Sequence, residues 1–254
     1  MPITEARLII DSRKNPYYNM GFDEALLVLK KQGIIPTTLR LYMWGPSTVT
    51  IGYFQRIRDV VNLEYAGKHN IPVVRRITGG GAVYHDMYGE ITYSIVLDAK
   101  GPLLDVQESY RIICSGLVET LRHIGLEASF APVNDIIVNN KKISGSAQTR
   151  KRSTILQHGT LLVSSNLDIM EKVLVVPKEK LISHKVVSIK DRVTTISIEL
   201  GRDIEPEDLI PYLIKGFEKA LNLKLIEEKP STKEVRLAEE LSEKYRKHEW
   251  NFKR

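Results

Sequence analysis

The spacing of apolar residues predicts where the helices of this chain lie. The clearest helix covers 105–124, where apolar side chains recur every three or four positions, at Tyr110, Ile113, Leu117, Leu121 and Ile124. The same kind of pattern predicts helices at 16–31, 57–70, 203–221 and 232–247. Asn15 and Pro16 are typical of a helix start, because asparagine caps free N–H groups and proline is tolerated in the first turn.

Short runs rich in β-branched and aromatic residues predict the strands, at 38–44, 48–54, 72–76, 134–138, 141–148 and 154–163. Gly45-Pro46-Ser47 predicts a hairpin between the first two, and Asn139-Asn140 predicts a second tight turn. Strands come in runs with helices between them, without strict βαβ alternation. We therefore predict an α+β fold, in which a mixed, largely antiparallel sheet is flanked by helices. No Gly/Ser linker divides the chain, so residues 1–254 are predicted to form a single domain.

Composition narrows the class of protein. The chain has 254 residues, of which 43% are hydrophobic and 27% charged, as in ordinary globular proteins. No apolar run of about 18 residues occurs, and the first residues lack the pattern of a secretory signal. We therefore expect a cytoplasmic protein with no membrane partner.

The net charge of +6 fits a nucleic acid, an acidic protein or a phosphate-bearing ligand. Basic residues concentrate mildly at 141–152 and 178–192, but no helix-turn-helix pattern or alternation of aromatic and basic residues supports nucleic-acid binding. The one cysteine, Cys114, allows no internal disulfide, and the six scattered histidines argue against a structural zinc site.

The strongest local motif is a glycine loop that follows a predicted strand. Arg75 and Arg76 end the strand, and Gly79-Gly80-Gly81 begins the loop, followed by Ala82-Val83-Tyr84-His85-Asp86. Glycines let backbone N–H groups approach an anion, and an arginine can pair with a phosphate or carboxylate. The motif predicts a nucleotide or acyl-phosphate site. The structural alternative is a flexible turn flanked by surface arginines, and neither a P-loop nor a dinucleotide fingerprint is present.

A second motif is a lysine that precedes small residues in a predicted hairpin. Lys142 is followed by Ile143-Ser144-Gly145-Ser146-Ala147, which leave room for a ligand. Its ammonium could stabilise charge on a phosphate and a carbonyl oxygen, and Asp135 could help to hold Mg²⁺. A solvent-facing lysine and a strand-edge carboxylate are the structural alternatives. His158, before Gly159, is in such a position more often a structural hydrogen-bonding group than a catalyst.

Taken together, these motifs resemble the lipoate–protein ligase A family. The likeness lies in Arg-Arg-x-x-Gly-Gly-Gly-Ala-Val-Tyr-His-Asp at 75–86, Asn-Asp at 134–135, Lys-Ile-Ser-Gly-Ser-Ala at 142–147 and His-Gly-Thr-Leu-Leu at 158–162. It extends in order over nearly the whole chain, through segments at 19–24, 51–55, 188–194 and 249–252. Such a collinear set is far more specific than any single motif.

The resemblance implies a biotin/lipoate-ligase-like fold and an ATP-dependent ligase. Lipoate and ATP would form lipoyl-AMP, and a lysine of a lipoyl domain or of the glycine-cleavage H protein would then take the lipoyl group. Lys142 would contact both the lipoyl carbonyl and the phosphate. The implied ATP and lipoyl-AMP site comprises Arg76, Gly79, Gly80, Gly81, Ala82, Val83, Tyr84, Asp135 and Lys142. The implied lipoate site comprises Lys142, His158 and Gly159, and Asp135 would hold Mg²⁺.

The chain departs from the family pattern in two respects. Many bacterial members carry a C-terminal accessory domain, whereas this sequence stops shortly after Trp250-Asn251-Phe252. We therefore expect a separate accessory subunit to supply that domain. In addition, Glu90 and Thr92 stand where many relatives have asparagine and a bulkier residue.

The main alternative is an octanoyltransferase or lipoyl transferase of the same fold, working through a thioester on a cysteine. In one such group the cysteine shortly precedes the segment that matches Asn134, but residues 127–133 contain none, and Cys114 lies on the apolar face of a predicted helix. The ligase is therefore favoured. A biotin ligase lacks support because its Gly-Arg-Gly-Arg-type loop is missing, and Arg76 and Lys142 argue against a non-enzymatic lipoyl-protein-binding subunit. The acceptor and the choice between lipoate and octanoate stay open.

Overall fold

The computed structural model describes residues 3–175 and 188–254. The predicted basic run at 178–192 therefore lies mostly outside the described residues. In the described part, no helix is both long enough and apolar enough to cross a membrane.

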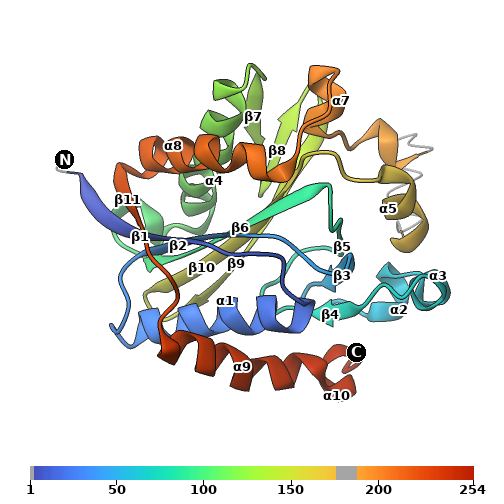
Figure 1. Cartoon of the computed structure of the whole chain (residues 1–254), viewed down its shortest axis with the longest axis horizontal. Coiled ribbons are helices and arrows are strands. Elements are labelled where there is room, and N and C mark those ends of the chain that lie inside the picture. Colours follow the sequence, from blue (N-terminus) through green and yellow to red (C-terminus); the bar gives the residue numbers. More distant parts are fainter. Residues whose placement is uncertain (1–2, 176–187) are drawn as a thin grey trace.

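A mixed sheet of eight strands forms the centre of the molecule (Figure 1), in the order β11-β1-β2-β6-β10-β9-β8-β7. β1 pairs in parallel with β11 and β2, and the remaining pairs are antiparallel. The strands are β1 Thr4–Ile10, β2 Thr38–Tyr42, β6 Glu90–Asp98, β7 Ala128–Ala131, β8 Asp135–Val138, β9 Lys141–Lys151, β10 Thr154–Leu162 and β11 Leu223–Glu227. A smaller sheet has the order β4-β3-β5, with β3 Thr48–Ile51, β4 Val73–Arg75 and β5 Val83–His85.

Helices cover both faces of the large sheet, as Figure 1 shows. On one face, α4 (Val106–His123) and α8 (Ile210–Leu221) pack over an apolar cluster that includes Leu39, Ile95 and Ile155. On the other face, α1 (Pro16–Lys31) and α9 (Thr232–Arg246) pack over a cluster that includes Val96 and Leu156. The small sheet is flanked by short helices, α2 Ile57–Val60, α3 Leu63–Lys68, α5 Leu167–Val173 and α10 His248–Asn251. The remaining elements are α7 Ile196–Leu200 and the 3₁₀ turns Gly101–Leu104, Ile189–Asp191 and Pro206–Leu209.

Side-chain alternation along β10 explains how two polar groups come to lie on opposite faces of the sheet. Successive residues of a strand point to opposite faces. Ile155 packs under α4, so Gln157 lies on that side, while Leu156 packs under α1, so His158 faces α1. The hydrogen bonds agree, because Gln157 contacts Cys114 of α4 and His158 contacts Asp23 of α1.

The predicted fold class is confirmed, as are the helices at 16–31, 105–124 and 232–247 to within a residue or two. The Asn139-Asn140 turn is confirmed too: both residues have positive φ, 48° and 63°, and they join β8 to β9. The predicted hairpin at Gly45-Pro46 is wrong, because β2 pairs with β1 and β6 whereas β3 belongs to the small sheet. The predicted helix at 57–70 is interrupted, since Asn62 caps a new helix through its hydrogen bond from the Tyr65 N–H.

Close contact between α4 and α8 gives a stability prediction. A Cβ on Gly216 would lie 2.3 Å from Thr120 Oγ1 and 2.4 Å from the carbonyl oxygen of Gly116. We expect Gly216→Ala to lower the free energy of unfolding by about 1–3 kcal/mol, because the helices must separate. Urea denaturation measures this. In the control Gly67→Ala on α3, the new methyl meets nothing within 4 Å, so stability should stay equal or rise by up to about 1 kcal/mol. Equal effects of the two changes would contradict the packing argument.

Candidate functional site

A pocket of about 520 Å³ lies between the glycine loop and strands β9 and β10. Its buried part is lined by Met20, Tyr42 and Trp44, and its more exposed part by Lys142 and the backbone of residues 80–83. An apolar interior with a few polar groups at the opening is typical of a small-molecule site.

Arg76 holds the glycine loop from beneath. Its five N–H groups are all directed at protein acceptors: Nε donates to Thr78 Oγ1 (3.0 Å), Nη1 to the Thr50 carbonyl and hydroxyl oxygens (3.3 and 3.0 Å), and Nη2 to the carbonyl oxygens of Gly79 and Gly81 (both 2.7 Å). The side chain is buried, which lowers its pKa to about 10, still far above neutrality. Arg76 therefore shapes the loop, whereas the resemblance implied a direct contact with phosphates.

Loop carbonyls that turn toward Arg76 leave loop amides for the pocket. Gly80 has φ of +88°, a conformation that favours glycine. In the described part of the chain, the N–H groups of Gly80, Gly81 and Ala82 donate to no protein acceptor, and all three residues line the pocket. Free amides of this kind form a site for an anionic oxygen.

Two chains of hydrogen bonds support Arg76, and each runs through a threonine and a histidine to a carboxylate; we call them relays. In the first, Arg76 donates to the Thr78 hydroxyl, which lies 2.8 Å from His158 Nε2, and His158 Nδ1 lies 2.9 Å from Asp23 Oδ2. Because Thr78 accepts from Arg76, its own proton points at Nε2, and His158 donates from Nδ1 to Asp23. His158 thus acts as a structural hydrogen-bonding group at the pocket wall.

The pKa shifts agree with a neutral His158 beside an ionised Asp23. Burial lowers the pKa of His158 and outweighs the attraction of Asp23. Burial alone would raise the pKa of Asp23, but the hydrogen bond from His158 and the charge of Arg40, whose Nη1 lies 3.2 Å from Oδ1, lower it instead.

The second relay runs from Arg76 through Thr50 to a residue pair that the sequence analysis missed. Arg76 donates to the Thr50 hydroxyl, which lies 2.8 Å from His85 Nε2, and His85 Nδ1 lies 2.6 Å from Glu90 Oε1. The Thr92 hydroxyl also donates to Glu90 (2.7 Å) and accepts from Trp44 Nε1 (2.8 Å). The departures at Glu90 and Thr92 thus form one hydrogen-bonded pair behind the pocket. Their joint departure from the family pattern was the available signal.

Lys142 reaches across the opening of the pocket. Its Nζ lies 2.7 Å from Asp135 Oδ1, and the side chain is 41% exposed. A Cβ on Gly145 would lie 2.6 Å from this Nζ, so the glycine makes room for the lysine. The backbone of Lys142 is fixed by hydrogen bonds to Arg192 and Thr194.

The structure brings most of the predicted site residues together. Those that line the pocket are Arg76, Gly80, Gly81, Ala82, Val83, Lys142, His158 and Gly159. Gly79 acts through its carbonyl, which binds Arg76. Tyr84 packs instead in the core of the small sheet, where burial raises its pKa to about 12.

Asp135 is paired with Lys142, and among residues 3–175 and 188–254 no group of three or more His, Cys, Asp or Glu side chains could hold a metal ion. The residues present therefore do not by themselves form a Mg²⁺ site. The involvement of Mg²⁺ and ATP stays a prediction.

Cys114 lies in the core on the buried face of α4, as the sequence predicts. The residue is fully buried, and its Sγ is 3.5 Å from Ser146 Oγ and from Gln157 Nε2. Burial raises the pKa of the thiol to about 11, so the thiolate is scarce at neutral pH.

Comparisons with known proteins place this site in a family. The model of the lipoyl protein ligase A/B catalytic domain matches residues 15–218. Octanoyltransferase LipM of Brevibacillus brevis is 34% identical over 98% of this chain and 99% of that protein. Octanoyltransferase LipM of Geobacillus kaustophilus is 35% identical over 94% and 95%, respectively.

The solved structures that resemble this chain include one from an archaeal lipoylation system, a bi-partite lipoate protein ligase and its E2 lipoyl domain from Thermoplasma acidophilum. The two chains superpose with a TM-score of 0.86 at 32% identity, covering 98% of this chain and 96% of that one.

The predicted ATP-dependent lipoate–protein ligase is wrong by these comparisons. Curated relatives that are 32–35% identical over nearly the full chain are octanoyltransferases, which transfer an acyl group without adenylating it. The glycine loop and Lys142 could not discriminate, because ligases and transferases of this fold both stabilise an acyl carbonyl. The absence of a cysteine at 127–133 therefore does not exclude a transferase.

The first relay yields a prediction about pH. The pKa of His158 is lowered in the folded protein, so the unfolded chain binds a proton first as pH falls below the ordinary value of 6.5. This contribution to stability is complete above about pH 6.5 and is lost as pH falls toward the folded pKa. We expect His158→Gln to show a flatter dependence of unfolding free energy between pH 7.5 and 5.5. Parallel curves for the variant and the parent would contradict a neutral, buried His158.

Proposed function

Because this chain belongs to the lipoyl protein ligase A/B catalytic domain family, we propose that it is an acyltransferase that moves an octanoyl group from a thioester to a lysine of a lipoyl-domain protein. The observation that carries the proposal is that Lys142 and the free loop amides lie together at the opening of an apolar pocket. Near-full-length likeness to octanoyltransferases supports the choice of acyl group.

The apolar interior of the pocket suits a saturated acyl chain. Met20, Tyr42 and Trp44 offer carbon surface there, and each is at least 95% buried. The carbonyl carbon of a chain inserted into this interior would then lie near the opening, where Lys142 and the amides of Gly80–Ala82 gather. Removing a chain of this length from water favours binding by roughly 0.8 kcal/mol per buried CH₂ group.

The polar opening suits the charge that develops during acyl transfer. Attack on a thioester carbonyl creates a tetrahedral oxyanion, and preorganised donors stabilise it. Lys142 supplies a full positive charge, and the loop amides supply donors that Arg76 holds in place. Asp135 keeps the lysine directed across Gly145.

A direct displacement fits these residues better than a covalent acyl-enzyme. In the direct route the lysine amine of the acceptor attacks the carbonyl carbon, a C–N bond forms, and the C–S bond breaks. The departing thiolate takes up the proton that the new amide loses, so no oxidant or cosubstrate is needed. Cys114 is the one cysteine of the sequence, and it is fully buried with a raised pKa, so it is poorly suited to attack first.

The proposed acceptor rests on the Thermoplasma acidophilum system, in which a related ligase was studied with its E2 lipoyl domain. That system is bi-partite, which supports the expectation of a separate accessory subunit for this chain as well.

The proposal is tested by mass spectrometry of an apo lipoyl domain incubated with the protein and an octanoyl thioester. We expect octanoylation of one lysine without ATP. Lys142→Ala should lower the rate about 100–1000-fold, because the oxyanion loses its cation. The neighbouring Lys141→Ala is the matched control, since Lys141 binds the Lys190 carbonyl and does not line the pocket. Transfer that requires ATP, or equal loss in both variants, would overturn the proposal.

The direct route makes a separate prediction for the thiol. Cys114→Ser should keep the transfer rate within about twofold, since a buried thiol of high pKa is a poor nucleophile. Rates on the lipoyl domain and the mass of the denatured enzyme check this. An enzyme-bound octanoyl group that disappears in Cys114→Ser together with activity would establish a thioester route instead.

A further inference from the structure

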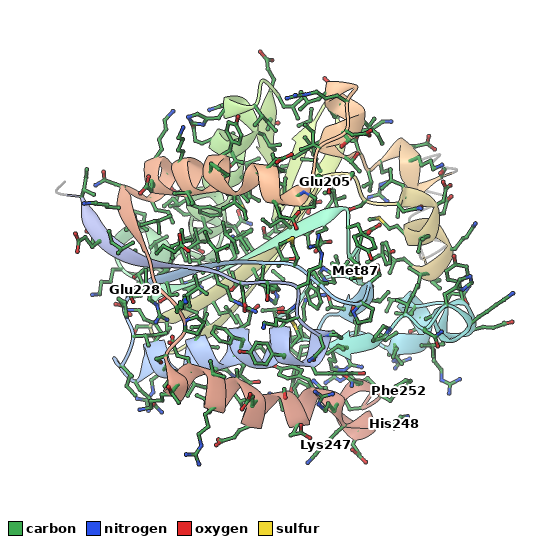
Figure 2. The ribbon with its side chains drawn as sticks, viewed as in Figure 1. Met87, Glu205, Glu228, Lys247, His248 and Phe252 are labelled. Atoms are coloured by element: carbon green, nitrogen blue, oxygen red, sulfur yellow. The ribbon has the colours of Figure 1, made fainter. Side chains whose placement is uncertain are left out.

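Among the described residues, a cluster of cations without ion-pair partners lies beside the glycine loop, on residues 53–58 and the C-terminal residues. We call it the basic face, and it comprises Tyr53, Phe54, Arg56, Arg58, Lys253 and Arg254. None of the ion pairs in residues 3–175 and 188–254 includes any of its four cations. An adjoining groove of about 730 Å³ is lined by Arg56, Arg58, Arg254, Ile57, His248 and Phe252, with Asp59 as its one acid. Figure 2 shows His248 and Phe252 at the edge of the molecule, beyond the end of α9.

Two cations of the basic face, Lys253 and Arg254, lie close enough to repel each other. Burial lowers the pKa of Lys253, Tyr53 opposes this shift, and the charges of Arg75 and Arg254 lower the pKa further. Burial is the main cause that lowers the pKa of Arg75, and the charge of Arg254 lowers it further. A cluster in which several cations meet a single acid among the described residues, Asp59, favours a negatively charged partner.

Exposed aromatic rings accompany the charges. Phe54 is 68% exposed and Phe252 37%. Lys253 Nζ lies 3.4 Å from the ring centroid of Tyr53 and 3.8 Å from that of Trp250. These contacts hold the C-terminal residues against the turn at residues 52–55. Arg75 strengthens this attachment by donating to the carbonyl oxygens of Trp250, Asn251 and Gln55. Together these contacts preorganise the C-terminal residues against residues 53–55, which lowers the cost of binding a partner.

The basic face adjoins the opening of the pocket. A Cβ on Gly52 would lie 2.1 Å from the Gly80 carbonyl oxygen, so the two backbones are in direct contact. The Tyr53 N–H donates to the Thr78 carbonyl (2.8 Å). Phe54 follows Gly52 by two residues, at most about 7 Å of backbone. A protein bound to the face would therefore lie next to the site of acyl transfer.

From this geometry we infer that the basic face docks the acceptor protein through acidic side chains that flank its target lysine. The inference rests on the proposed function, because that lysine must enter the pocket opening. The lysine is itself a cation and approaches Lys142 on a chain of net charge +6. Acidic neighbours on the acceptor offset this repulsion and match the unpaired arginines, which also accelerates encounter.

The test compares two double charge reversals of equal size. Arg56→Glu/Arg58→Glu changes the basic face, and Lys151→Glu/Arg152→Glu changes exposed cations at the β9–β10 turn. Octanoyl transfer is measured from the octanoyl thioester of N-acetylcysteamine to a lipoyl domain and to hydroxylamine, a small amine that needs no docking. Circular dichroism verifies that both variants fold.

We expect the first variant to raise KM for the lipoyl domain about 10-fold or more with little change in kcat, because charges at the rim act mainly on association. Its kcat/KM should depend less on salt, and its rate with hydroxylamine should match that of the parent. An unchanged KM for the lipoyl domain, or an equal rise of KM in the β9–β10 variant, would overturn the inference. So would a variant that binds nucleic acid more weakly than the parent but keeps the same KM for the lipoyl domain.

Binding of the lipoyl domain, measured by calorimetry without a thioester, separates the two proposals. Weaker binding in Arg56→Glu/Arg58→Glu alone supports the docking face even if the parent transfers no octanoyl group. Transfer by the parent with equal binding by both variants supports the proposed function and rejects the docking face.

Discussion

The buried guanidinium of Arg76 is the interaction on which the site depends. Two of its N–H groups hold the carbonyls of Gly79 and Gly81, and the others hold hydroxyl and carbonyl oxygens from β3 and the loop. A buried cation is costly unless its donors are satisfied. Satisfying all five fixes the loop in a conformation that turns its carbonyls inward and leaves its amides for the pocket.

Charge balance around Arg76 is achieved at a distance. No ion pair of the described residues includes Arg76, and the nearest carboxylates in its hydrogen-bonded network, Asp23 and Glu90, each act through a histidine and a threonine. This arrangement places two acids behind the pocket wall, whereas the acid near the pocket opening, Asp135, is paired with Lys142. An oxyanion that forms near Lys142 therefore meets the loop amides and an ammonium group whose only acidic partner is Asp135 among the described ion pairs.

Sequence patterns predicted what depends on neighbours along the chain. The Asn139-Asn140 turn, the Asn15 cap of α1 and the apolar stripe of α4 are local features, and the structure has all three. The pairing of β3 with β4 and β5 is not local, and the intervening Gly45-Pro46 turn gave no sign that the chain changes sheets there. His85 and Glu90 were missed for the same reason, since their importance comes from Arg76 and Thr50 across the small sheet.

The prediction of an ATP-dependent ligase was wrong for a related physical reason. Lys142, the glycine loop and the apolar pocket stabilise an acyl carbonyl whatever group leaves it, so these motifs define the family and not the donor. What distinguishes a thioester from an adenylate is the binding of the leaving group, for which the sequence offered Arg76 and Asp135. In the structure Arg76 is occupied by the loop and Asp135 by Lys142, so the residues chosen as marks of ATP chemistry have other partners.

Arg75 and Arg76 connect the pocket to the basic face. Consecutive residues at the end of a strand point to opposite sides. Arg76 therefore turns to the glycine loop, while Arg75 turns to α10 and the turn at residues 52–55. One dipeptide thus fixes both the wall of the pocket and the surface beside it, and the contact between Gly52 and Gly80 joins them. An acceptor held on that surface meets a pocket opening whose position is set by the same strand.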